Sequence, residues 1–137
     1  MVTLSGNILA VDFGEARVGL ALASYEAQLA HPVGTLQNDS SLLKQLRDLC
    51  EREKITRLVI GLPRGMDGQV TAQTAAARVF GAKLAEELEL PISWQDEAVT
   101  SAKAKAELEG RGKPYAKEEI DSLAATYILE DYIREQV

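Results

Sequence analysis

The chain has one cysteine and one histidine among its 137 residues. A lone cysteine cannot form an intrachain disulfide, and such low usage is typical of a reducing compartment. One histidine argues against a zinc site, because zinc sites in proteins draw on several His and Cys ligands. No Ser-His-Asp or Cys-His catalytic set can be identified either. We therefore expect a cytoplasmic protein that uses a different chemistry.

Long apolar runs and an excess of basic charge are also lacking. The longest apolar run, residues 18–23, is too short to cross a bilayer, and no basic segment followed by an apolar core opens the chain. We therefore expect no membrane segment. The net charge of −6 at pH 7 counts against a broad nucleic-acid-binding surface, because phosphate binding usually leaves a basic footprint.

The sequence does contain 46% hydrophobic residues, arranged in alternating strand-like and helix-like patterns. This length and content fit one domain over residues 1–137. Strands that alternate with helices predict an α/β fold, with a mostly parallel sheet that begins with an antiparallel hairpin. The expected elements are a hairpin around 8–19, an edge strand at 29–36, strands at 57–62 and 92–95, a loop at 63–68, and helices at 40–53, 71–88, 100–110 and 117–134.

Two of these elements carry more detailed predictions. Pro32 and Gly34 demote the segment 29–36 to an edge strand or a strand with a bulge. In the helix 71–88, helical spacing predicts one apolar stripe. The stripe is formed by Ala76, Phe80, Leu84 and Leu88.

The stretch Ile8–Gly19, ILAVDFGEARVG, is the centre of the predicted sheet. Its first strand is apolar on both faces, which is typical of a central strand, and it runs into Asp12. A buried carboxylate needs a partner, a hydrogen bond or a metal ion. Asp12 therefore has two open interpretations: a cap on the Phe13-Gly14 turn, or one of several acids that converge on a cation.

Two further acidic positions suggest such a convergence. Asp96 and Glu97 follow the last strand, and alternation along a strand shows only that they point to opposite faces. Asp121 falls on the apolar face of the last helix, although the helix dipole could also account for it. Clustered carboxylates repel one another unless a hard divalent cation such as Mg²⁺ or Mn²⁺ binds them.

Carboxylates that hold two such cations about 3.5 to 4 Å apart support in-line displacement at phosphorus. This pattern favours a nuclease. The Asp-Phe-Gly that follows a strand is also similar to the first phosphate loop of actin-like ATPases. The chain lacks a Walker lysine loop, and 137 residues are too few for the two-domain clamp of those enzymes.

Four sequence blocks together resemble the YqgF family, described as Holliday-junction-resolvase-like proteins and pre-16S ribosomal RNA nucleases. They are VDFGEARVGLALAS, VIGLPRGMDG, DEAVTS and EEIDSLAATYILEDYI, in the order found in the family. The resemblance implies a ribonuclease H-like fold with a five-stranded mixed sheet. It also implies an active site of Asp12, Glu97 and Asp121 that holds Mg²⁺ or Mn²⁺.

One position departs from the family pattern. The third block commonly reads Asp-Glu-Arg, and here Ala98 stands in the Arg position. The acids remain, so the change bears on phosphate contact more than on cation binding. Candidate substrate contacts elsewhere are Arg17, Arg64 in the PRGMDG loop, and Lys103 in a local basic cluster; Met66 and Asp67 belong to the same loop as Arg64.

The predicted function is that of a metal-dependent endonuclease acting on structured nucleic acid, most simply at the 5′ end of pre-16S rRNA during ribosome biogenesis. Two alternatives stay open: a Holliday junction resolvase, and a catalytically weak RNA- or ribosome-binding module. The expected partners are pre-rRNA, branched DNA or ribosomal particles. The sequence leaves open a monomer or a homodimer, since a two-fold junction would require two sites.

Overall fold

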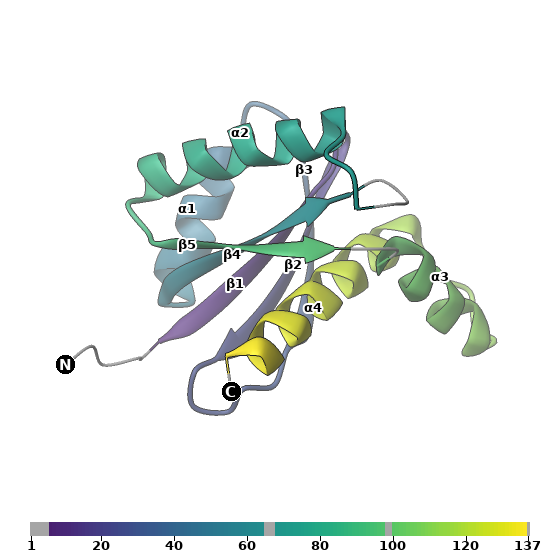
Figure 1. The fold of residues 1–137 in the computed structure, drawn as a ribbon. Coiled ribbons are helices and arrows are strands. Elements are labelled where there is room, and N and C mark those ends of the chain that lie inside the picture. The colour runs from purple at the N-terminus through teal and green to yellow at the C-terminus, as the bar shows by residue number, and fades with distance from the viewer. Residues whose placement is uncertain (1–5, 65–67, 98–99, 137) are drawn as a thin grey trace.

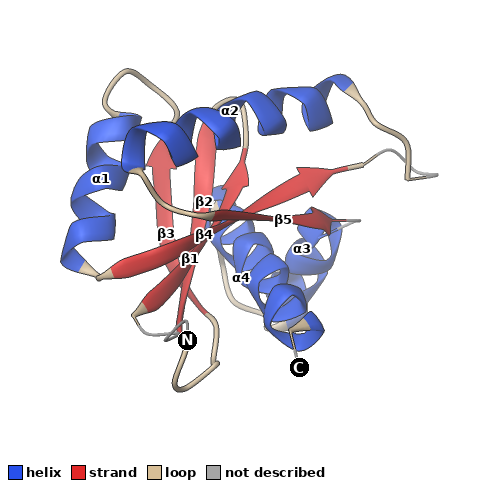
Figure 2. Ribbon diagram, turned by 60° about the vertical axis from the view of Figure 1, so that its left-hand side comes forward, coloured by secondary structure: helices blue, strands red, loops and turns tan. Residues whose placement is uncertain are grey.

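The computed structural model describes residues 6–64, 68–97 and 100–136. It forms three layers, with a twisted sheet between helices α1 and α2 on one face and helices α3 and α4 on the other (Figures 1 and 2). The elements are β1 (Asn7–Phe13), β2 (Arg17–Ser24), β3 (His31–Gln37), α1 (Leu42–Arg52), β4 (Ile55–Pro63), α2 (Ala72–Leu88), β5 (Ile92–Glu97), α3 (Thr100–Gly110) and α4 (Lys117–Glu135).

The sheet has five strands in the order β3-β2-β1-β4-β5. β1 pairs antiparallel with β2 and parallel with β4, and β4 pairs parallel with β5. The predicted mixed sheet, its opening hairpin and its central first strand are therefore confirmed. Because β1, β4 and β5 run in the same direction, their carboxyl ends lie at one end of the sheet (Figure 1).

β3 is an edge strand with an irregular register, as predicted. Its pairing with β2 shifts between Leu20 and Ala21. Gly34 has a φ of +110°, a left-handed conformation that favours glycine.

The apolar residues of β1 are buried on both faces of the sheet. Leu9 and Val11 belong to the core under α1 and α2, with Leu46, Leu58 and Ile60. Ile8 and Ala10 belong to the core under α4. Burial on both sides explains why the sequence of β1 is an unbroken apolar run, and it leaves Asp12 to face the α4 side.

The buried face of α2 is rotated around the helix relative to the predicted apolar stripe, and the prediction is wrong for Ala76. The buried residues of α2 are Thr74, Ala77, Gly81 and Leu84, while Ala76 is exposed and Phe80 and Leu88 are half-buried. The face of α2 that packs on the sheet carries small residues because the ring of Trp94 already fills the space beside Gly81. A Cβ atom added at Gly81 would lie 2.6 Å from Cη2 of Trp94 on β5.

The lone thiol and the helices give two further results. Cys50 is free and buried, and burial raises the pKa of its thiol to about 11, which keeps it protonated. Within residues 6–64, 68–97 and 100–136, every helix is too short or too polar to span a membrane.

Candidate active site

The three predicted acids lie in one pocket at the carboxyl end of the parallel strands. Asp12 comes from β1, Glu97 is the last residue of β5, and Asp121 lies in the second turn of α4. The pocket has a volume of about 290 Å³, and the first turns of α2 form another wall. Segments far apart in the sequence thus bring three carboxyl groups to the edge where open α/β sheets place their ligands.

Asp12 and Glu97 form a partly buried carboxyl pair. Burial raises the pKa of Asp12 well above its usual range, and the charges of Glu97 and Asp121 raise it further. Burial also raises the pKa of Glu97 to about 7. Direct contact between the two carboxyl groups couples their titration, so near neutral pH the pair tends to keep a proton.

Two glycines make room for these acids. A Cβ atom at Gly61 on β4 would collide with Oε2 of Glu97 and would lie 2.6 Å from Cδ1 of Ile128. A Cβ atom at Gly19 on β2 would collide with the backbone oxygen of Asp121. The absence of a side chain at these two positions therefore lets Glu97 turn toward Asp12 and lets α4 approach the sheet at Asp121.

The third acid is already engaged by a basic residue. Nε of Arg17 on β2 donates to Oδ2 of Asp121 at 2.7 Å, and each side chain is 25% exposed. Asp121 therefore has a basic partner from another element of the fold. Glu118 and Glu119 occupy the first turn of that helix.

The carboxyl groups of the pocket suit a hard divalent cation, although they are not assembled around one. Oε2 of Glu97 is buried and, among the described residues, has no hydrogen-bond partner. In the same part of the chain, no three His, Cys, Asp or Glu side chains are clustered tightly enough to hold a metal ion as they stand. Asp12 and Glu97 fit such an ion, because its charge would offset their mutual repulsion. Asp121 would join them once Arg17 released it.

The structure separates the two neighbouring acids that end β5. The side chain of Asp96 is 67% exposed, and its Oδ1 accepts from Nε and one terminal nitrogen of Arg64, at 3.0 and 2.9 Å. Only Glu97 lines the pocket. Alternation along the strand left these two residues open, and the family resemblance implied Glu97. The structure places Glu97 and not Asp96 in the pocket, and its role as a metal ligand stays a prediction.

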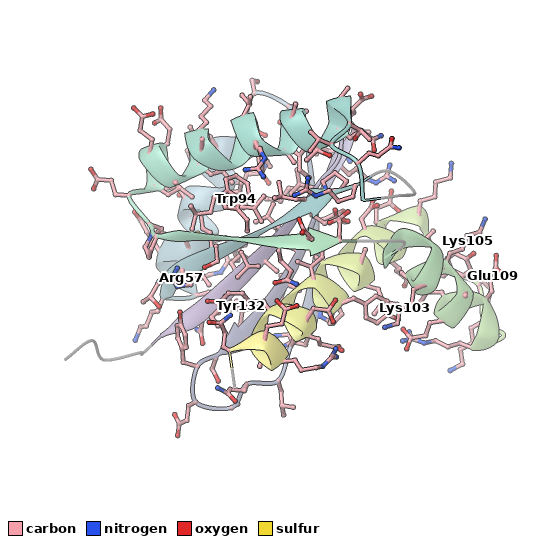
Figure 3. All side chains as sticks on the ribbon, viewed as in Figure 1. Arg57, Trp94, Lys103, Lys105, Glu109 and Tyr132 are labelled. Atoms are coloured by element: carbon pink, nitrogen blue, oxygen red, sulfur yellow. The ribbon has the colours of Figure 1, made fainter. Side chains whose placement is uncertain are left out.

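Of the three predicted substrate contacts, the structure brings only Arg17 to the pocket. Arg64 forms an ion pair with Asp96. Lys103 lies on α3 (Figure 3). Its Nζ lies 4.3 Å from the ring centroid of Tyr127. Substrate binding by these residues stays a prediction. Met66, Asp67 and Ala98 lie outside the described residues.

Sequence reasoning missed the contribution of α2 to the pocket. Ala72, Gln73 and Ala76 line it, so the exposed side of the first turns of α2 faces the acids. Thr71 caps this helix by accepting from the backbone N–H of Thr74, whose hydroxyl donates to the carbonyl of Pro63. Thr71 could have been recognised in the sequence as an N-cap, because Thr is a preferred residue at that position. Its link to the end of β4 depends on the tertiary structure.

Comparison with known proteins places the chain in a family. The family model described as "RuvX: Holliday junction resolvase" matches residues 6–135. The chain belongs to the RuvX family. A Maridesulfovibrio salexigens protein named "Putative pre-16S rRNA nuclease" is 35% identical over 131 residues, covering 93% of this chain and 97% of that protein. A Chloroflexus aggregans protein of the same name is 37% identical, covering 93% and 92%. The predicted family and nuclease class agree with these results.

Solved structures show the same fold as this RuvX family member. T. thermophilus RuvC in complex with a Holliday junction substrate has a TM-score of 0.60 at 14% identity, covering 96% of this chain and 97% of that chain. The Fowlpox virus resolvase, solved with Holliday junction DNA, has a TM-score of 0.56 at 10% identity, covering 96% and 99%. The predicted ribonuclease H-like fold is thereby confirmed. At these identities the likeness concerns the fold alone.

Proposed function

We propose that this chain is a metal-dependent endonuclease that hydrolyses phosphodiester bonds in structured nucleic acid. The observation that carries the proposal is the partly buried pair of Asp12 and Glu97, which shares a pocket with Asp121. Oε2 of Glu97 is buried and has no hydrogen-bond partner among the described residues. Desolvated acids that repel one another destabilise a fold. A cation would offset that cost. The family is described as Holliday junction resolvases, and cleavage of nucleic acid is a reaction in which acids that bind a cation can take part.

Asp12, Glu97 and Asp121 are the residues that would hold Mg²⁺ or Mn²⁺. When bound, such ions supply an activated water and stabilise charge at the phosphoryl group and the leaving oxygen. The chain's own contribution is placement. β1 and β5, which flank β4 in the sheet, fix two carboxyl groups at the same end of the sheet, and α4 brings the third.

Arg17 has a second role in this proposal. Its Nε donates to Asp121 in this structure, and once Asp121 has turned to the ion, the N–H groups of the guanidinium can donate to a phosphate oxygen at the mouth of the pocket. Arg17 would therefore position the substrate backbone beside the acids. It would do so in a chain whose net charge of −6 offers no broad attraction for nucleic acid.

For the substrate, we favour the 5′ region of pre-16S rRNA over a four-way DNA junction. The relatives that match over nearly the whole chain carry the name of a pre-16S rRNA nuclease, whereas the junction complexes belong to structures of 14% identity or less. A cytoplasmic location and contact with ribosomal particles belong to the same proposal, in which the chain acts as a monomer or a homodimer.

The test is cleavage of a labelled pre-16S rRNA fragment and, in parallel, a labelled four-way junction. Wild type and Asp12→Asn would be compared with Mg²⁺, with Mn²⁺ and with chelator. We expect metal-dependent cutting of the RNA that falls at least about a hundredfold in Asp12→Asn. Glu86→Gln, at an exposed position of α2, is the matched control and should cut like wild type.

Each other outcome has a definite meaning. Cutting of the junction alone would assign the resolvase function. Retained RNA binding without cutting of either substrate would instead favour a binding module. The ion pair of Arg17 with Asp121, which keeps the third acid from the other two, favours this second candidate.

A further inference from the structure

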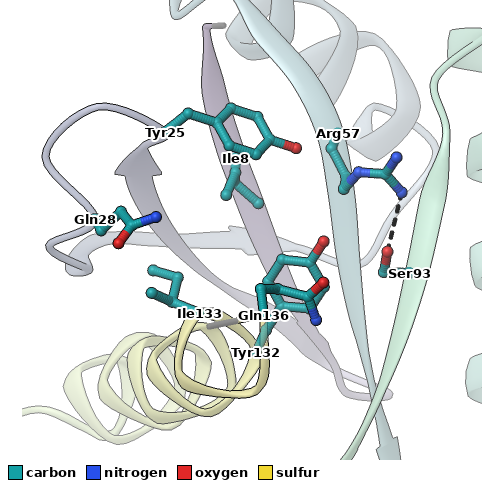
Figure 4. Close-up of a pocket in the computed structure, with 8 residues that line it drawn as sticks. All are labelled: Ile8, Tyr25, Gln28, Arg57, Ser93, Tyr132, Ile133 and Gln136. Carbon is teal, nitrogen blue, oxygen red and sulfur yellow. Dashed lines mark hydrogen bonds between the residues drawn. The ribbon is translucent and has the colours of Figure 1, made fainter. Parts of the chain in front are cut away.

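A second pocket lies at the opposite end of the sheet from the acids. It has a volume of about 360 Å³ and is formed by the first residues of β1, β4 and β5, the β2–β3 connection and the last turns of α4 (Figure 4). Ile8 belongs to this pocket and Asp12 to the acidic one. At about 3.3 Å per strand residue, four residues separate the two pockets by roughly 13 Å along β1.

Arg57 gives this pocket an unusual charge. The chain has eight arginines, and six pair with a carboxylate: Arg17, Arg47, Arg52, Arg64, Arg111 and Arg134. Arg78 lies over the ring of Trp94. Within the described residues, Arg57 donates only to the neutral hydroxyl of Ser93, at 3.0 Å. In an acidic chain, a half-buried guanidinium without a counter-charge is a candidate anion-binding group.

The other polar groups of the pocket face the same side as this guanidinium. The hydroxyls of Tyr25 and Tyr132 point toward the side where Arg57 and Ser93 lie (Figure 4). Tyr132 is only 8% exposed, so its ring is held in place by packing. Among the described lining residues there is no Asp or Glu. Three hydroxyls and a guanidinium thus form a donor-rich wall that suits a phosphate group.

The rest of the pocket suits a larger organic group. Ile8 and Ile133 provide an apolar surface, while the amides of Gln28 and Gln136 can both donate and accept hydrogen bonds. A volume of about 360 Å³ falls in the usual range for pockets that bind small ligands. Such a cavity can hold a phosphate together with a flat ring that carries polar edges.

We propose that this pocket binds a nucleoside 5′-monophosphate, with the phosphate on Arg57 and Ser93 and the nucleoside over Ile8 and Ile133. The same chemical group occurs free in solution and at the phosphorylated end of an RNA strand. Both sources fit the pocket, since it opens to solvent beside the C-terminal end of α4. This site is separate from the acids and does not depend on the nuclease proposal.

The test uses the whole chain in chelator, so that no cleavage occurs. Adenosine 5′-monophosphate, adenosine and inorganic phosphate would be titrated separately, and amide resonances would be followed by NMR. We expect saturable binding of the monophosphate, with shifts at Ser93, Tyr25 and Gln136 and none at Asp12. Adenosine and inorganic phosphate should each bind at least tenfold more weakly, because each lacks half of the contacts.

Variants assign the contact to one side chain. Arg57→Gln should weaken binding of the monophosphate at least tenfold, and Arg57→Lys should retain part of the affinity. Arg52→Gln removes an exposed arginine of α1 that does not line the pocket, and it should bind like wild type. The amide spectrum of each variant reports whether it is folded. Equal affinity of wild type and folded Arg57→Gln would overturn the proposal, as would shifts centred on the acids.

A 5′-phosphorylated and a 5′-hydroxyl RNA tetramer distinguish the two sources. Binding of the phosphorylated tetramer at least as tightly as the monophosphate, with loss in Arg57→Gln, would assign the site to strand ends. Binding of the monophosphate alone would assign it to free nucleotide. If none of these probes reaches saturation up to about 10 mM, the binding free energy is weaker than about −3 kcal/mol. That result would overturn the site itself.

Discussion

Glu97 and Asp12 are acids whose pKa values the fold raises, and this makes stability depend on pH. Burial raises the pKa of Glu97 from 4.5 to about 7, and it raises that of Asp12 in the same direction. Below about pH 4.5 both folded and unfolded chains are protonated at Glu97. As the pH rises toward 7, the unfolded chain loses this proton first, so the free energy of unfolding falls.

The variant Glu97→Gln should remove this fall in the free energy of unfolding at rising pH. In chelator at pH 8, we expect it to be more stable than wild type by on the order of 2 to 3 kcal/mol, and at pH 4 to be similar. Urea unfolding at intervals from pH 4 to pH 8 measures the difference. Glu86→Gln, on the exposed side of α2, should follow the wild-type curve. If the free energies of unfolding of Glu97→Gln and wild type change with pH in parallel, burial does not raise the pKa of Glu97.

At the scale of elements, the contact of β2 with α4 fixes the third acid. Gly19 pairs with Asp12 across the hairpin and also touches the backbone of Asp121, so one glycine lies beside two of the acids. A neighbouring side chain could rotate away from an added methyl group, whereas a backbone carbonyl in a packed helix cannot. The position of α4, and with it that of Asp121, therefore depends on glycine at this residue.

Gly19→Ala should push the first turns of α4 away from the sheet. We expect a loss of about 1 to 3 kcal/mol in the free energy of unfolding, and faster amide hydrogen exchange in α4. Gly110→Ala is the matched control, because a Cβ atom there would meet nothing within 4 Å. Unchanged stability and exchange in Gly19→Ala would mean that the helix can shift without cost.

At the scale of the whole molecule, cation binding should stabilise the fold. The partly buried acids repel one another, so an ion that binds only the folded chain raises its free energy of unfolding. At pH 8, a Mg²⁺ concentration a hundred times the dissociation constant should add about 2.7 kcal/mol. Thermal unfolding of wild type and Asp12→Asn, with and without Mg²⁺, measures this. An equal rise in both proteins would place the ion elsewhere.

Local patterns in the sequence predicted the elements and the three candidate acids. Apolar runs bounded by turn residues indicated the strands, and Asp12 stood out because a carboxylate directly follows an apolar run. α2 differs, because Trp94 decides which of its faces can pack closely, and Trp94 comes from a strand that follows the helix. A helical wheel contains no information on that neighbour.

Four properties follow from the amino-acid sequence alone, since each depends on composition or on spacing along the chain: the element order, the central first strand, the family resemblance and the excess of acids. Three other results required the tertiary structure: Glu97 lies beside Asp12, Arg17 pairs with Asp121, and Arg57 lacks a carboxylate partner among the described residues. These outcomes depend on strand register and on helix placement. They bring together side chains as far as 104 residues apart, a distance over which local pattern carries no signal.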